Sequence, residues 1–135
     1  MQEVEQLTEL GKQAFGHAIS NAHEVTNFIL FVMTEDEHGK GELHRFPSPS
    51  NSKSLALAHA FIAKERTRFA VIAYKGFMTD DRKNVDAIFV DLYDREQGCG
   101  VEMGRRFQPK TPDVEMSFIG DMQVLSENTP YPSGG

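Results

Sequence analysis

The chain has one cysteine, no tryptophan and no apolar run approaching the roughly 18 residues that a membrane-spanning helix needs. The lone Cys99 has no second cysteine with which to form an internal disulfide, as is typical of proteins kept in a reducing compartment. Residues 1–6 are acidic and lack the basic start and unbroken apolar segment of a secretory signal. We therefore expect a cytoplasmic protein that does not enter a membrane.

Positive charge is also scarce. The 14 lysine and arginine residues are outnumbered by 20 aspartate and glutamate residues, which gives a formal net charge of −6. A surface of that sign repels phosphate backbones at long range, so we expect no binding to nucleic acid. Of the 135 residues, 39% are hydrophobic and 25% are charged, which are the proportions of a folded globular domain rather than a disordered chain.

Four apolar-rich segments follow one another in the second half of the chain, with only turn-forming residues between them. They are Phe69–Tyr74, Val85–Tyr93, Val101–Phe107 and Glu115–Met122. Strands so close in sequence leave no room for crossover helices, so we expect them to pair as an antiparallel meander. The second segment carries apolar side chains at both its odd and its even positions, which indicates that both faces of the sheet are covered.

The first half of the chain predicts two helices and two shorter strands. Apolar residues recur at helical spacing from Val4 to Ala22, and a serine-rich stretch offers N-caps for a second helix over residues 53–66. Residues 27–33 are apolar on both faces, as in an interior strand. Residues 42–46 alternate between polar and apolar side chains, as in an edge strand.

The predicted fold class is therefore α+β, with a mainly antiparallel sheet of about five to six strands and two helices packed against it. The expected element order is α-β-β-α-β-β-β-β. We expect a single domain over residues 1–126. Residues 127–135 end in proline, serine and glycine and are predicted to form a flexible tail.

The order helix–strand–strand–helix–strands resembles that of the profilin-like and Roadblock-type folds, which act as dimerising scaffolds. It also resembles the JAB metalloprotease fold, but Tyr74–Phe77 contains no histidine, so this resemblance implies a degenerate relative without the zinc site. The stretch from Phe69 to Arg95 joins two apolar strands through a turn rich in aspartate and arginine. In this it is similar to small bacterial and phage proteins without an assigned function. None of these resemblances brings functional residues with it.

Four residues are candidates for a pocket between the second helix and the sheet, namely His44, His59, Tyr74 and Asp91. His59 stands beside the apolar positions of the second predicted helix, where it could line a pocket with His44 or Tyr74. Asp91 interrupts an apolar face of the meander, and carboxylates in such surroundings often have raised pKa values and take part in acid–base chemistry. Asp86 and Asp94 on or near the same strand, and Glu102 on the next strand, are the other carboxylates with which it could pair. A structural salt bridge from Asp91 to Arg105 or Arg106 is the other interpretation.

Other chemistry has less support in the sequence. The five histidines show no close pair such as His-x-x-x-His, so we predict no metal site and no cofactor. Cys99 is flanked by glycines in a predicted hairpin turn, which is a poor place to position a catalytic triad. We predict no catalytic residues and favour a protein that is not an enzyme.

Large apolar side chains near the predicted strand ends suggest a surface that binds protein, with Phe77, Met78 and Phe107 as the candidates. We therefore expect a small non-catalytic interaction or regulatory module that forms a homodimer or binds a protein partner. The alternative is a small-ligand-binding protein or an enzyme that uses the pocket of His59, Asp91 and Tyr74.

Overall fold

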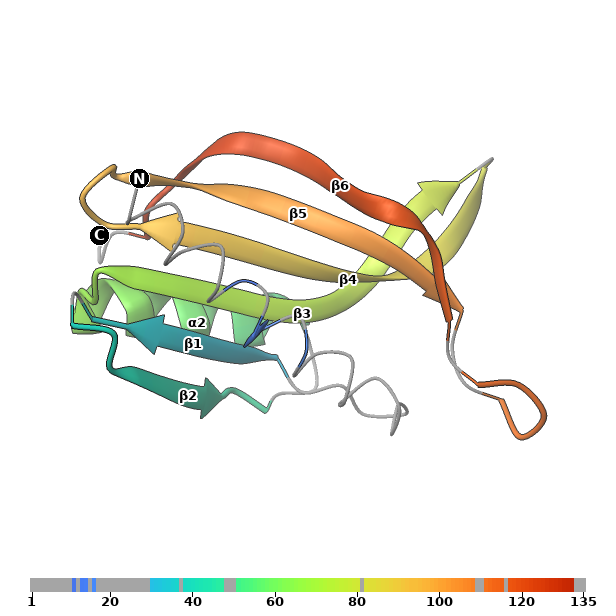
Figure 1. Ribbon diagram of the computed structural model, residues 1–135, viewed down its shortest axis with the longest axis horizontal. Coiled ribbons are helices and arrows are strands. Elements are labelled where there is room, and N and C mark those ends of the chain that lie inside the picture. Colours follow the sequence, from blue (N-terminus) through green and yellow to red (C-terminus); the bar gives the residue numbers. More distant parts are fainter. Residues whose placement is uncertain are drawn as a thin grey trace.

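The computed structural model describes residues 11, 13, 14, 16, 30–36, 38–47, 51–80, 82–108, 111–115 and 117–132. Within these residues, six strands form one sheet in the order β2-β1-β3-β4-β5-β6, and every neighbouring pair is antiparallel (Figure 1). The elements are β1 (Phe31–Glu35), β2 (Gly41–Arg45), α2 (Asn51–Glu65), β3 (Phe69–Asp80), β4 (Lys83–Asp94), β5 (Cys99–Gln108) and β6 (Ser117–Pro130).

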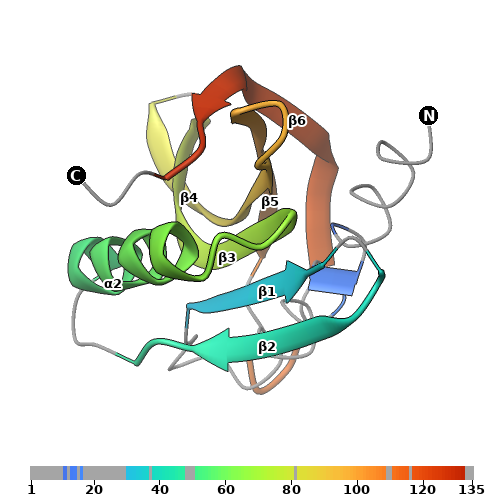
Figure 2. The same cartoon turned by 90° about the vertical axis from the view of Figure 1, so that its left-hand side faces the viewer.

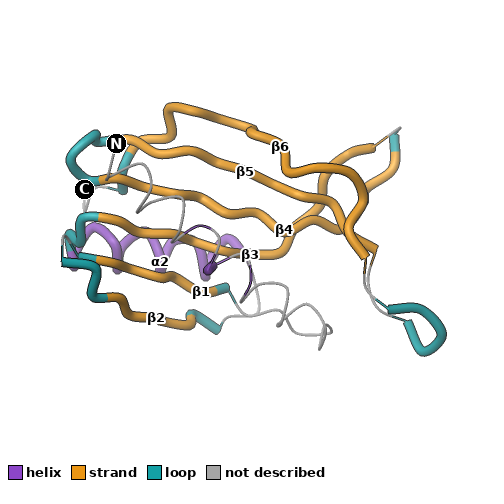
Figure 3. Tube along the Cα trace, in the orientation of Figure 1, coloured by secondary structure: helices purple, strands orange, loops and turns teal. Residues whose placement is uncertain are grey.

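The predicted α+β class with two helices is wrong. The described part of the chain is mainly antiparallel sheet, and α2 is the one helix with defined ends in it (Figure 3). The helix predicted from Val4 to Ala22 lies outside the described residues, apart from four helical positions at residues 11, 13, 14 and 16. The share of residues in strands is larger than predicted, because the strands of the second half are longer than the apolar segments that predicted them.

The antiparallel meander predicted for the second half is present. β3 pairs with β4 from Phe69↔Asp94 to Asp80↔Lys83, so the two strands stay paired up to the turn of this hairpin. Arg82 takes up the turn with a φ of 67°. A two-residue loop keeps both strands in register up to the turn, which extends the ladder beyond the apolar segments that predicted it. The prediction that residues 42–46 lie at an edge agrees with the place of β2 in the sheet.

The C-terminal strand also extends further than predicted. β6 continues to Pro130, and the Tyr131 hydroxyl donates a hydrogen bond to the backbone oxygen of Thr67 at 3.1 Å. The Tyr131 ring also meets the Tyr93 ring edge to face, with 6.1 Å between centroids. Strand pairing and Tyr131 therefore attach residues 127–132 to the sheet, and the flexibility predicted for the tail stays a prediction.

α2 covers one face of the sheet beside β1 and β3 (Figure 2). Ala58 and Ile62 are one helical turn apart on the same side of α2, and both are fully buried. They belong to one apolar cluster with Val32, Ile72 and Tyr93, which come from three neighbouring strands. This cluster fixes α2 across the sheet, and we call the sheet face that it covers the α2 face.

The opposite face holds a second apolar cluster, which includes Phe31, Phe69, Ile88, Val90 and Phe107. Each of these side chains is at most 1% exposed. Successive side chains of a strand point to opposite faces. On β4, Ile88, Val90 and Leu92 belong to this second cluster, whereas Tyr93 belongs to the cluster under α2. Both faces of β4 are therefore covered, as its sequence predicts.

A buried ion pair joins the start of β3 to the end of β4. Arg68 Nε donates to Asp94 Oδ1 at 2.9 Å, and Arg68 Nη2 donates to Asp94 Oδ2 at 3.4 Å. Arg68 also contacts Glu96 at 3.2 Å, and its guanidinium lies 4.7 Å from the centroid of the Phe69 ring. Because both members of the pair are buried, each satisfies a charge that water does not reach.

We expect the substitution Asp94→Ala to lower the free energy of unfolding by about 2–4 kcal/mol, because it leaves a buried guanidinium without its two-point partner. The control is Asp86→Ala, which removes a looser contact of 3.5 Å to the partly exposed Lys75. For that variant we expect a loss of about 1 kcal/mol or less. Urea unfolding of both variants measures the difference, and equal losses would contradict the assigned role of Asp94.

Candidate functional site

The candidate site lies where β4 pairs with both of its neighbours. Asp91 stands opposite Ile72 of β3 on one side and opposite Glu102 of β5 on the other. Residues directly opposite in an antiparallel pair point to the same face, with Cβ atoms about 5 Å apart. Because Ile72 belongs to the cluster under α2, the two carboxyl groups face each other on the α2 face.

Aromatic rings flank the two carboxyl groups. The ring of Phe89 lies between Gly76 of β3 and Gly104 of β5, where a Cβ atom would come within 2.8 Å and 3.1 Å of it. Tyr74 stacks on Phe89, with 5.2 Å between ring centroids and 16° between planes. A side chain at Gly76 would require Phe89 to move, and one at Gly104 would crowd the ring, so the two glycines leave room for Phe89 and the tyrosine that stacks on it.

The Tyr74 hydroxyl donates to Glu102 Oε2 at 3.4 Å, which links the aromatic pair to the carboxyl pair. We call Tyr74, Phe89, Asp91 and Glu102 together the carboxyl–aromatic cluster. Its residues come from β3, β4 and β5, so three adjacent strands position it. Side chains held on paired strands have fixed directions, which is the arrangement that a binding or catalytic site needs.

Burial differs within the cluster. Asp91 is 4% exposed, whereas Glu102 and Tyr74 are half-buried. The Oδ1 atom of Asp91 is buried and has no hydrogen-bond partner in the described part of the chain. Leaving such an atom unsatisfied costs about 1–3 kcal/mol.

Burial and the neighbouring negative charges both raise pKa values in and beside the cluster. Burial raises the pKa of Asp91 to about 7, and the charge of Glu102 and a hydrogen bond with it act in the same direction. Burial also raises the pKa of Tyr74 and of the nearby Tyr93, and the charges of Asp91 and Glu102 add to this. The phenols therefore stay protonated as hydrogen-bond donors, and the carboxyl pair binds a proton up to near-neutral pH.

Of the four predicted pocket residues, the structure brings Asp91 and Tyr74 together on adjacent strands. His59 is exposed on α2 and does not join them. The apolar residues around His59 in the sequence predict that it lies on the buried side of the helix. In the structure Ala58 and Ile62 face the sheet, whereas His59 lies beside this buried stripe of the helix. A rotation of about 100° separates adjacent residues of a helix, which is enough to move His59 to the surface.

His44 is also separate from the cluster. It lies in the same cross-strand row as Asp91, but Val32 and Ile72 stand between them. Three strand spacings amount to about 14 Å, too far for direct contact. The His44 ring instead packs against Phe61 of α2 at 4.4 Å. The predicted grouping of two histidines with Asp91 is therefore not what the structure shows.

The sequence suggests Arg105 or Arg106 as the structural partner of Asp91, and that interpretation is wrong. Arg105 Nε donates to the backbone oxygen of Gly120 at 2.9 Å, and Arg106 stands opposite Ala87 rather than opposite Asp91. Glu102 takes the opposite position because the hairpin pairs Asp94 with Cys99. Counting outward from a four-residue turn at residues 95–98 is the sequence signal that leads to this pairing.

The predicted interface residues also differ in their surroundings. Phe77 is 65% exposed on β3 near the hairpin loop, and Met78 beside it is half-buried. Phe107 is 1% exposed and belongs to the core cluster opposite α2, so its prediction as an interface residue is wrong. Phe107 stands opposite Phe118 of β6, and this pairing encloses it within the sheet.

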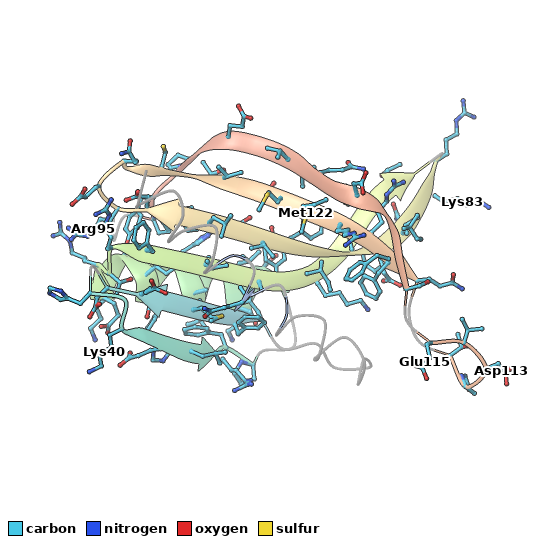
Figure 4. All side chains as sticks on the ribbon, in the orientation of Figure 1. Lys40, Lys83, Arg95, Asp113, Glu115 and Met122 are labelled. Atoms are coloured by element: carbon cyan, nitrogen blue, oxygen red, sulfur yellow. The ribbon has the colours of Figure 1, made fainter. Side chains whose placement is uncertain are left out.

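A more extended exposed surface lies along β6. Among the described strands β6 pairs only with β5, so its outer side is a free edge. Three apolar residues of β6 are exposed, namely Ile119, Val124 and Leu125. The last part of the chain, residues 111–135, contains four acidic residues and no lysine, arginine or histidine. Two of them, Asp113 and Glu115, lie on the loop that extends beyond the sheet before β6 (Figure 4).

Comparison of the chain with family models, with curated proteins and with solved structures found no match. The resemblances noted in the sequence therefore stay predictions. Within the described ranges, no helix has both the length and the apolar character needed to cross a membrane. The same residues contain no group of three or more His, Cys, Asp and Glu side chains that could hold a metal ion. A proposal for the function therefore rests on the geometry of the carboxyl–aromatic cluster and of β6.

We expect Asp91→Asn to stabilise the protein at alkaline pH. The raised pKa means that the folded state binds more protons than the unfolded state between about pH 4 and about pH 7, so the stability of the natural chain falls as pH rises through this window. The asparagine variant lacks this titration. At about pH 8 we expect it to be more stable by on the order of 2 kcal/mol, and at about pH 4.5 by much less.

Urea unfolding at the two pH values measures this difference. Glu115→Gln, a change at an exposed loop residue, is the control and is expected to leave the pH dependence of the natural chain in place. The same pH dependence in Asp91→Asn as in the natural chain would contradict a titrating Asp91.

Proposed function

We propose that the protein is an interaction module that binds a basic, extended segment of a partner protein along the free edge of β6. The observation that carries this proposal is a 14-residue edge strand with exposed apolar side chains in an acidic part of the chain. A free edge offers a row of backbone N–H and C=O groups to an added strand. Side chains on one face of that added strand would then meet Ile119 and Leu125, and those on its other face would meet Val124.

The negative charges of β6 favour a positively charged partner. Asp121 and Glu127 are both exposed, and the strand has no basic residue. A second copy of this chain pairing through β6 would line up acidic residues from both copies, and like charges across strands destabilise a pair. A partner segment with lysine or arginine on alternate positions meets complementary charge instead. We therefore favour a basic partner protein over a homodimer.

The first test uses a fluorescein-labelled peptide of eight residues in which valine and lysine alternate. We expect saturable binding to the full chain below about 100 μM, with amide shifts in β6, and a peptide of alternating valine and glutamate should not bind. Asp121→Lys is expected to weaken binding by about tenfold or more. Raising the salt from about 0.05 to about 0.5 M is expected to weaken it as well.

The matched control is Glu65→Lys, which makes the same charge change at an exposed position at the end of α2. This variant should bind the peptide like the natural chain. Two results would contradict the proposal: equal loss of binding in both variants, or amide shifts confined to strands other than β6. A stable dimer of the free protein at low salt would favour the second copy instead.

A second candidate function is supported by a separate observation. The unpartnered, buried Oδ1 of Asp91 lies in a cluster of two carboxyl groups and two stacked aromatic rings. Small-molecule sites combine apolar walls with a few polar groups that fix the orientation of the ligand. The second proposal is therefore that the carboxyl–aromatic cluster is a ligand site, in place of the pocket of His59, Asp91 and Tyr74 expected from the sequence.

A further inference from the structure

We propose that the carboxyl–aromatic cluster binds a small organic molecule through a protonated primary amine. This inference rests on the second of the two functions proposed above and adds the chemical class of the ligand.

The cluster has more acceptor oxygens than donors, although Asp91 and Glu102 share a hydrogen bond and Tyr74 donates to Glu102. Asp91 Oδ1 has no hydrogen-bond partner, and in the described part of the chain neither Asp91 nor Glu102 forms a salt bridge with lysine or arginine. Tyr74 donates its proton to Glu102 and keeps lone pairs with which to accept. An ammonium group has three N–H donors and no acceptor. One donor each for Asp91, Glu102 and Tyr74 would satisfy all three oxygens.

The aromatic residues favour an organic cation over a metal ion. Tyr74 and Phe89 stack face to face, and a cation close to such rings is attracted by their π electrons. Calcium takes six to eight oxygen ligands, and the cluster supplies oxygens from three side chains. The rings can instead cover the apolar part of an amine while its charged end reaches the carboxyl pair.

The members of the cluster differ in exposure. Glu102 and Tyr74 are half-buried, while Asp91 is 4% exposed, so a ligand would reach Asp91 past these two side chains. A bound ammonium therefore replaces a proton that the pair holds when empty. The groups that face this exchange are Tyr74 on β3, Tyr93 on β4 and Glu102 on β5. Because the proton must leave, we expect tighter binding as pH rises.

The test is a titration of the isotope-labelled full chain with phenethylamine, followed through the amide signals of β4 and β5 around Asp91 and Glu102. We expect saturable shifts at about pH 8 and an affinity lower by about threefold or more at about pH 6. Asp91→Asn and Glu102→Gln are each expected to weaken binding by about tenfold or more. Glu115→Gln on the exposed loop should bind like the natural chain.

Two further probes make the outcomes distinct. 2-Phenylethanol has the same skeleton without the charge and is expected to bind at least about tenfold more weakly. If both compounds bind the cluster equally, the amine class is wrong and the ligand site stands. If calcium chloride shifts the same signals at lower concentration than phenethylamine, the organic cation is wrong. No shift with any of the three probes would contradict both the ligand class and the site.

Discussion

β4 is paired along most of its length on both sides, with β3 and with β5, and this double pairing sets the positions on which the site depends. In a strand, a shift of one residue moves every side chain to the other face. The two hairpin loops that flank β4 fix its register against both neighbours. They place Val90 in the core opposite α2 and Asp91 on the α2 face, opposite Glu102. The cluster, the apolar cores and the position of α2 all follow from that register.

Two buried aspartates on β4, Asp91 and Asp94, have opposite kinds of neighbour. Asp94 receives two hydrogen bonds from Arg68, so its charge is compensated and the pair joins two strands. Asp91 is buried to a similar extent but faces another carboxyl group. The second arrangement stabilises the protonated form of Asp91. A carboxyl pair that costs stability when ionised is the observation on which the proposed ligand site rests.

The two surfaces proposed for binding lie on neighbouring strands. Ser126 of β6 stands opposite Glu102 of β5, and Leu125 approaches Gly104 beside the Phe89 ring. A segment added to the outer side of β6 would therefore be separated from Glu102 by β6 alone, and from Asp91 by β6 and β5. Both proposals also use acidic residues to select a positively charged ligand, which agrees with the net charge of −6.

The sequence by itself determined the antiparallel meander and marked Asp91 as a charge on an apolar face, because both follow from the alternation of side chains along a strand. Only the tertiary structure decided that Glu102 is its neighbour, that His44 is three strands away and that Phe107 is enclosed in the core. The same holds for the exposure of His59. These relations join residues that are distant in sequence, and they depend on hairpin register and on the rotation of α2 about its own axis. Packing across the whole sheet sets both, and no local pattern of residues contains that information.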